Sequence, residues 1–232
     1  MSKSGKKYRA VREKIEASRE YDPEEAVTLL KELVYARFNE TVELVVGLGI
    51  DARRSDQMVR GTVTLPHGTG KKVRVLVFCK PDSVEEAREA GADFAGGKEL
   101  IEKIKSGWLD FDIAVASKEM MREVSQLGKI LGPRGLMPSP KSGTVTEDIT
   151  RTVKEVKAGK IEIKSDKFGH IQVAVGKVSF PESNLLENIQ SIIKEIKRLR
   201  PPASKGKYIR KAYICSTMSP AVKLDTSKLA AS

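Results

Sequence analysis

The chain has 232 residues, of which 40% are hydrophobic and 31% are charged. This length can bury the core of one large domain or of two ordinary ones, and this composition excludes a disordered chain or a fibre. The 42 Lys and Arg residues outnumber the 31 Asp and Glu residues, so the net charge is +11.

Sequence features that would direct the chain to a membrane or to secretion are missing. No apolar run reaches the eighteen or so residues that a membrane span requires, so we expect no membrane partner. The basic N-terminus lacks the apolar stretch of a secretory signal. Cys79 and Cys215 are too few and too distant for a disulfide framework or a cysteine zinc site. We therefore predict a soluble, intracellular protein.

Positive charge is concentrated toward the C-terminus. Residues 159–232 carry 14 Lys and Arg against 6 Asp and Glu, an excess of +8, whereas residues 72–158 carry 15 against 14. Such a concentration repels itself unless a polyanion neutralises it. The C-terminal segment lacks the bulky aromatic side chains of a membrane-surface helix, so nucleic acid is the favoured partner.

The first third of the sequence predicts one helix followed by two strands. Asp22 is a candidate helix cap and Pro23 suits a first helical turn, so a helix is expected from Pro23 to about Arg37. Alternating apolar residues then predict strands at Thr41–Leu48 and Gly61–Leu65. The breaker-rich stretch 66–70 ends this part of the chain.

The middle of the chain alternates short apolar runs with helical patterns. Val73–Cys79 and Phe111–Ala116 are nearly continuous apolar runs, which are typical of strands covered on both faces. A shorter strand is expected at 92–95, and helices are expected at 84–90, 98–105 and 118–127. This alternation predicts a three-layer, Rossmann-like α/β domain with a parallel sheet.

The last third returns to helix and alternating-strand patterns. A helix is expected at 148–157, strands joined by a hairpin-like connection at 160–164 and 171–175, the strongest helix at 182–199, and a strand at 208–214. The simplest organisation is an α+β split domain with a mixed or antiparallel sheet, formed by residues 1–70 and 159–232. The three-layer α/β domain, residues 71–158, interrupts it.

No set of residues indicates catalysis, a metal or a cofactor. Gly47–Ala52 formally matches a dinucleotide-binding pattern, but no amphipathic helix follows it and no acidic residue lies about twenty residues on. Lys141-Ser142 resembles the end of a phosphate loop, yet Pro140 removes the required amide donor. The only histidines, His67 and His170, lack partners at metal-ligand spacing.

Two other stretches are candidates for contacts with nucleic acid. The loop Gly128–Lys141 is rich in glycine and proline and carries Lys129, Arg134 and Lys141, which suit phosphate oxygens. A structural crossover loop is an equal alternative. The stretch 213–220 ends a strand in small hydroxyl residues, which let an RNA backbone approach, and Met218 can lie against a base or ribose. Phe38 offers a second apolar platform.

Several strings follow one another in order along nearly the whole chain, at residues 38–43, 47–51, 53–57, 60–63, 65–71, 91–93, 107–112, 131–140 and 217–218. Together they resemble the family of ribosomal protein L-one, of the large subunit, in its bacterial form.

The resemblance implies a split domain with the main RNA site and an inserted α/β domain. The RNA-contact positions that it implies are Arg37, Phe38, Thr41, Lys167, His170, Ser216, Thr217, Met218, Ser219 and Pro220, with Lys129, Arg134 and Lys141 as further contacts. Arg54, in the connection after the first strand, is a further candidate for RNA contact. Ser219 stands where the family usually has glycine. Either its Cβ crowds an approaching RNA backbone, or the position does not require a positive φ.

The resemblance also implies a function without catalysis or cofactor. The protein is expected to be a monomer when free and a constituent of the cytoplasmic ribosome, where it binds large-subunit rRNA at the mobile stalk and assists the movement of exit-site tRNA. It is also expected to repress translation by binding the mRNA of its own operon. Two alternatives stay open: a nucleotide-dependent RNA-modifying enzyme that uses the middle domain, and a DNA-architectural protein.

Overall fold

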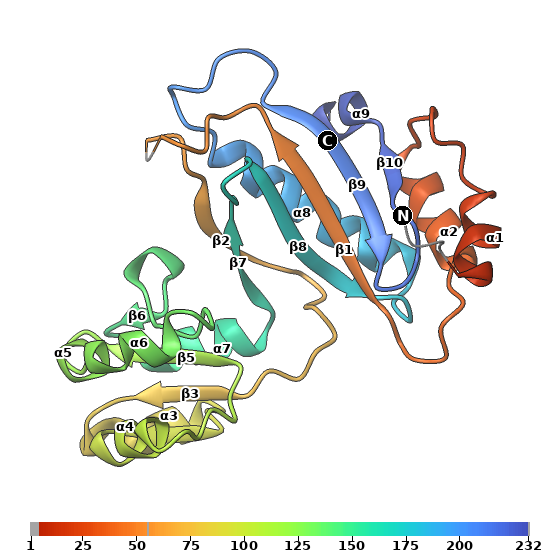
Figure 1. The fold of residues 1–232 in the computed structure, drawn as a ribbon. Coiled ribbons are helices and arrows are strands. Elements are labelled where there is room, and N and C mark those ends of the chain that lie inside the picture. The colour runs from red at the N-terminus through yellow and green to blue at the C-terminus, as the bar shows by residue number, and fades with distance from the viewer. Residues whose placement is uncertain (1–4, 55, 232) are drawn as a thin grey trace. The chain divides into compact units, whose positions relative to one another are not determined.

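Both ends of the chain contribute to one compact unit of the computed structural model, and the middle of the chain forms a second unit (Figure 1). The structure describes residues 5–54 and 56–231. Unit 1 comprises Met1–Gly70 and Glu162–Ser232, and unit 2 comprises Lys71–Ile161.

A four-stranded antiparallel sheet forms the centre of unit 1. Its strands lie in the order β10 (Val222–Leu224), β9 (Ile209–Ser216), β1 (Thr41–Leu48) and β8 (His170–Lys177). Alternate residues of β1, beginning with Val42, are buried. They face α2 (Pro23–Glu32) and α8 (Glu182–Arg198), which cover one side of the sheet (Figure 1). The apolar stripe predicted for residues 182–199 is buried in α8.

A separate two-stranded sheet, β2 (Arg60–Thr64) with β7 (Lys160–Lys164), corrects one prediction. Residues 160–164 were expected to pair with 171–175 through a hairpin-like connection, but only the single bridge between Ser165 and Ile171 joins them. The reason is that Ser165 binds Val59 instead: its amide donates to the Val59 carbonyl (2.9 Å), and its hydroxyl accepts from the Val59 amide (3.1 Å).

The ends of the chain hold elements that sequence patterns did not predict. These are α1 (Lys6–Arg12), β10 and α9 (Thr226–Ala231). Helix α1 buries none of its side chains, so it has no apolar stripe to detect. Helix α2 ends at Glu32 rather than near Arg37, because the buried Leu33 caps it and the chain then turns toward β1.

Unit 2 is the three-layer α/β arrangement that its alternating pattern predicted. Its four strands are all parallel, in the order β4 (Phe94–Gly96), β3 (Val75–Phe78), β5 (Ile113–Ser117) and β6 (Val145–Thr146). One face packs on α3 (Val84–Glu89) and α7 (Ile149–Lys157). The other packs on α4 (Lys98–Lys105), α5 (Met121–Val124) and α6 (Gly128–Leu131).

The glycine-rich stretch 128–141 is more regular than expected. It begins with the short helix α6, which is held by the fully buried Leu131, and it ends in the 3₁₀ turn Pro140–Ser142. The helix expected at 118–127 is likewise shorter, consisting of α5 and the 3₁₀ turn Ser125–Leu127. A third 3₁₀ turn, Pro81–Ser83, precedes α3. None of the helices in the described part of the chain is both long and apolar enough to cross a bilayer.

An ionic cluster closes the edge of the unit 2 sheet where the chain enters it. Asp112 accepts from the Lys71 ammonium (2.6 Å) and from the Arg74 backbone amide (3.1 Å). The Lys71 and Arg74 hydrogen bonds outweigh desolvation and lower the pKa of Asp112 from 3.8 to about 2. A depressed carboxyl pKa stabilises the fold above the unfolded value, and this stability is lost as pH falls from about 4 to about 2.

We therefore expect Asp112→Asn to lower the unfolding free energy of unit 2 at pH 7 by about 1–2 kcal/mol and to remove that acid dependence. Trp108, the single tryptophan, packs in the unit 2 core and reports its unfolding by fluorescence. The control is Asp82→Asn in the exposed Pro81–Ser83 turn. Equal unfolding energies for wild type and Asp112→Asn at pH 7 would contradict the assignment.

Candidate nucleic-acid interface

Two segments far apart in the sequence meet at one end of unit 1. Residues 35–41 lead into β1, and residues 216–220 lead out of β9, which pairs with β1 so that Val42 lies opposite Ser216 (Figure 1). We call this surface, residues 35–41 and 216–220, the shelf. Phe38 and Met218 lie on it with 54% and 45% of their surface exposed. Two large apolar side chains are thus presented to solvent on one end of the unit.

A buried carboxylate holds the shelf together. Glu40 is completely buried, and its Oε2 accepts from the Ser216 hydroxyl (2.6 Å) and the Met218 amide (2.9 Å). Its Oε1 accepts a longer bond from the Ala36 amide (3.4 Å). Glu40 forms no ion pair with any residue that the structure describes. Hydrogen bonds alone therefore stabilise this buried charge, and they fix the backbone that carries Met218.

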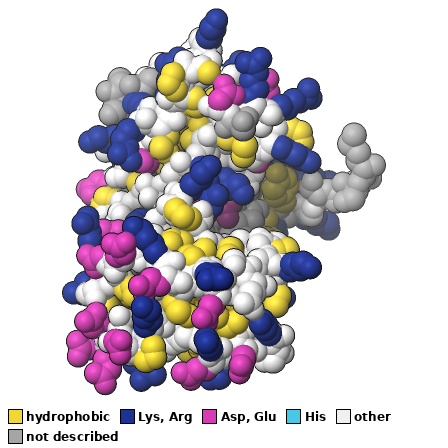
Figure 2. All heavy atoms as spheres, turned by 90° about the vertical axis from the view of Figure 1, so that its left-hand side faces the viewer, with side chains coloured by type: hydrophobic (Ala, Val, Ile, Leu, Met, Phe, Trp, Pro, Cys, Tyr) yellow, Lys and Arg dark blue, Asp and Glu magenta, His cyan; other side chains and the backbone are white. Residues whose placement is uncertain are grey.

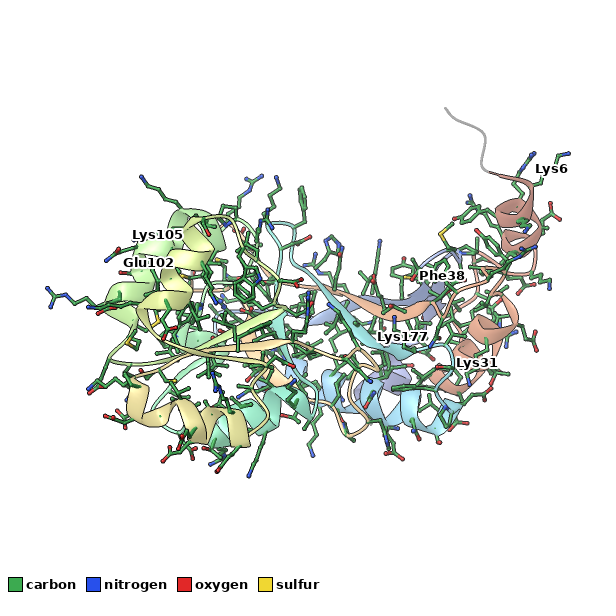
Figure 3. All side chains as sticks on the ribbon, turned by 90° about the horizontal axis from the view of Figure 1, so that it is seen from below. Lys6, Lys31, Phe38, Glu102, Lys105 and Lys177 are labelled. Carbon is green, nitrogen blue, oxygen red and sulfur yellow. The ribbon has the colours of Figure 1, made fainter. Side chains whose placement is uncertain are left out.

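Further hydrogen bonds lock the two segments to each other. The Tyr35 hydroxyl donates to the Met218 carbonyl (2.9 Å), and the Thr41 amide donates to the Thr217 hydroxyl (3.1 Å). The Lys177 ammonium in turn donates to the Thr41 hydroxyl (2.7 Å). Figure 3 shows Phe38 and Lys177 at the same end of unit 1. The Thr217 side chain stays exposed, so its hydroxyl can also meet a ligand.

Three predicted contact residues lie under or within the shelf rather than on it. Ser216 and Pro220 are buried, so their side chains lie beneath this surface. Ser219 is partly exposed, and its hydroxyl accepts from the Ser216 amide (2.9 Å). Positive φ angles among the described residues occur only at glycines, so Ser219 needs none. Serine therefore adopts this backbone without strain.

A second group of predicted residues lies at the opposite end of β1. His170 pairs with Gly47, whereas Thr41 pairs with Lys177, so about 20 Å of strand separates His170 from the shelf. Lys167 is exposed in the turn before His170, and Arg54 is exposed in the connection after β1, 3.9 Å from Asp51. The structure therefore divides the predicted unit 1 residues into two groups. One is the shelf, on which Arg37 is exposed, and the other, which we call the basic turn, consists of Lys167 and His170 with the nearby Arg54.

The basic turn is held by Asp166. Its carboxylate accepts from the Phe168 and His170 amides, each at 2.8 Å. Desolvation raises the pKa of Asp166, but these hydrogen bonds and the nearby His170 outweigh it, so the net shift is downward. Gly169 adopts φ +81°, which the tight turn requires. Lys167 is therefore carried on a locked backbone.

The three predicted cations of unit 2 are exposed on separate elements. Lys129 lies in α6, Arg134 in the following loop and Lys141 in the 3₁₀ turn. These three residues all belong to unit 2.

The motifs that suggested enzymes have structural explanations. A Cβ at Gly49 would clash with the Lys207 carbonyl oxygen, so close packing requires glycine at this position of the dinucleotide-like pattern. Cys79 is fully buried, and burial raises the pKa of its thiol. The described residues contain no cluster of His, Cys, Asp and Glu that could hold a metal ion.

Acidic and basic side chains are not spread evenly over the surface. On the face shown in Figure 2, acidic side chains gather mainly in the lower part of the view among Lys and Arg, whereas the upper part is mostly basic. The fold and the site thus define a mixed α/β protein with a preformed apolar shelf that carries the exposed Arg37.

Comparison with known proteins identifies the family. A family model described as the ribosomal protein L1p/L10e family matches residues 30–220. The large ribosomal subunit protein uL1 of Chlorobaculum tepidum is 53% identical over 231 residues, covering 100% of both chains. That of Kosmotoga olearia is 50% identical over 229 residues, covering 99% of both. The chain belongs to this ribosomal protein family and is not an enzyme.

Removing the buried carboxylate is expected to loosen the shelf. Glu40→Ala leaves the Ser216 hydroxyl and the Met218 amide without an acceptor, so we expect a loss of about 2–4 kcal/mol in unfolding free energy. Glu40→Gln keeps one acceptor oxygen and is expected to lose about 1 kcal/mol. Denaturant unfolding followed by circular dichroism measures both, and hydrogen exchange at the Met218 amide measures the local effect.

Glu43→Gln is the matched control, because Glu43 lies three residues further along the chain, on β1, with its side chain exposed. Its expected change is within about 0.5 kcal/mol. If Glu40→Ala were no less stable than this control, the Glu40 carboxylate would not be the support of the shelf.

Proposed function

We propose that this protein is a structural constituent of the large ribosomal subunit and binds large-subunit rRNA through the shelf. The observation that carries the proposal is the pair of exposed apolar side chains, Phe38 and Met218, on a backbone fixed by Glu40. Family membership and the names of the relatives support the ribosomal setting. On this proposal the protein is a monomer when free and works in the cytoplasm as part of the ribosome.

Recognition follows from the preformed surface. Phe38 and Met218 pack against ribose or base faces, and the exposed Thr217 hydroxyl bonds an RNA hydroxyl. Because the shelf is already ordered, RNA binding pays little conformational entropy for it. Ser216 and Pro220 are assigned a positioning role beneath the shelf, since both are buried. Ser219 supports the same backbone.

Phosphate contacts supply affinity. Arg37 on the shelf and Arg54, Lys167 and His170 at the basic turn are placed to meet phosphates of an RNA that runs along β1. Each neutralised phosphate releases counterions and contributes about −0.7 to −0.9 to the salt slope of log affinity. Lys129, Arg134 and Lys141 supply further contacts from unit 2.

The domain roles extend this proposal. Residues 1–70 and 159–232 form the RNA-binding domain, and residues 71–158 form the inserted domain. Contact with exit-site tRNA at the mobile stalk, and repression of translation through mRNA of the same operon, reuse these surfaces. Protection of the same shelf residues by rRNA and by operon mRNA in footprinting would support a shared site.

Binding should discriminate RNA from DNA. Folded large-subunit rRNA is expected to bind much more tightly than a DNA duplex of equal charge at matched salt, because DNA lacks the 2′-hydroxyl. Dissociation constants measured across a salt series test this directly. Equal affinities for the two would instead favour a DNA-architectural protein.

The Thr217 hydroxyl is expected to contribute directly. Thr217→Val should weaken rRNA binding by about 1–3 kcal/mol, because the buried RNA partner is left without a hydrogen bond. Thr217→Ser keeps the hydroxyl and is the matched control. Since Thr217 also accepts from the Thr41 amide, melting temperatures of both variants must be compared. An unchanged dissociation constant for Thr217→Val would refute this role.

A further inference from the structure

A groove separates helix α1 from the shelf. Its volume is about 620 Å³, within the roughly 300–1,000 Å³ typical of small-ligand sites. The side chains that line it and bear on the argument are Lys6, Lys7, Tyr8, Arg12, Tyr35 and Met218. In Figure 3, the helix carrying Lys6 and the loop carrying Phe38 lie toward the same end of unit 1.

The two walls of the groove differ in rigidity. The shelf wall is fixed, because Tyr35 and Met218 are hydrogen-bonded to each other and the Met218 amide is bound to Glu40. The α1 wall buries no side chain of its own. Beyond the helix, the Glu16 amide donates to the Tyr21 hydroxyl (3.1 Å), which ties this segment to the unit. The α1 wall can therefore adjust to an occupant while the shelf wall stays in place.

The chemistry of the lining points to a nucleotide. Among the described residues, Lys6, Lys7 and Arg12 form no ion pair, and no acidic side chain lines the groove. In the same unit, Arg19, Lys223 and Lys228 are each paired with a carboxylate. Unneutralised cations beside two phenols and a thioether suit a phosphate with its ribose or base.

We propose that this groove binds a nucleotide of the RNA strand next to the one on the shelf, with α1 as an adjustable clamp. This inference rests on the proposed function and names a contact region beyond it. Lys7 and Arg12 meet the phosphate, while Tyr8 and Met218 pack on the sugar or base.

Charge-matched double variants test the groove. Lys7→Gln with Arg12→Gln removes one lysine and one arginine that line it. Arg9→Gln with Lys14→Gln removes the same two residue types from exposed positions of the same segment that do not line it. Because α1 buries no side chain, both variants are expected to fold, which circular dichroism checks. The probe is the large-subunit rRNA fragment that the wild-type chain protects in footprinting.

We expect the groove variant to bind this RNA about tenfold more weakly than the control variant. The slope of its log affinity against log salt concentration should also be shallower than that of the control variant, by about one. Equal losses in the two variants, or no loss in either, would overturn the groove while leaving the shelf proposal intact. Failure of the wild-type chain to bind the RNA at all would overturn both.

Discussion

The shelf depends on the burial of one carboxylate. A carboxylate without solvent or a cationic partner is costly unless hydrogen-bond donors surround it, so Glu40, Ser216 and Met218 constrain one another. The constraint joins a segment before β1 to a segment after β9, about 180 residues away in the chain. The hydrogen bond to Glu40 fixes the Met218 backbone in a position that leaves the Met218 side chain exposed. The apolar surface is therefore formed without a ligand.

Periodic elements were predictable, and irregular contacts were not. Strand β1 and helix α4 match their predicted bounds, because a buried face imposes its period on the sequence. Strand β7 was assigned the wrong partner, since the hydrogen bonds of Ser165 to Val59 leave no periodic trace. Helix α1 was missed for a related reason: a helix that buries nothing has no apolar stripe.

In the site, too, some residues could be predicted from the sequence and others could not. Phe38, Thr217 and Met218 were identified from residue type and family resemblance, and the structure places them on one surface. Glu40 was not singled out, because a single acidic residue before a strand ordinarily lies in solvent. Nothing in the sequence indicates that its carboxylate is buried, since the donors come from the other end of the chain. Conversely, the burial of Ser216 and Pro220 could not be read from their residue types.

A larger share of the Lys and Arg residues is held in ion pairs in unit 2 than in unit 1, among the residues that the structure describes. In unit 2, cations such as Lys71, Arg74 and Lys157 are held by carboxylates, and the 17 Lys and Arg of Lys71–Ile161 against 14 Asp and Glu leave a net charge of +3 out of the +11 of the whole chain. A paired cation that binds a phosphate must first give up its carboxylate, so it contributes less to counterion release. Lys7 and Arg12 in unit 1 have no ion-pair partner among the described residues, so they break no ion pair when they bind a phosphate. Phosphate affinity should therefore come mainly from unit 1, at the surface where the apolar contacts discriminate.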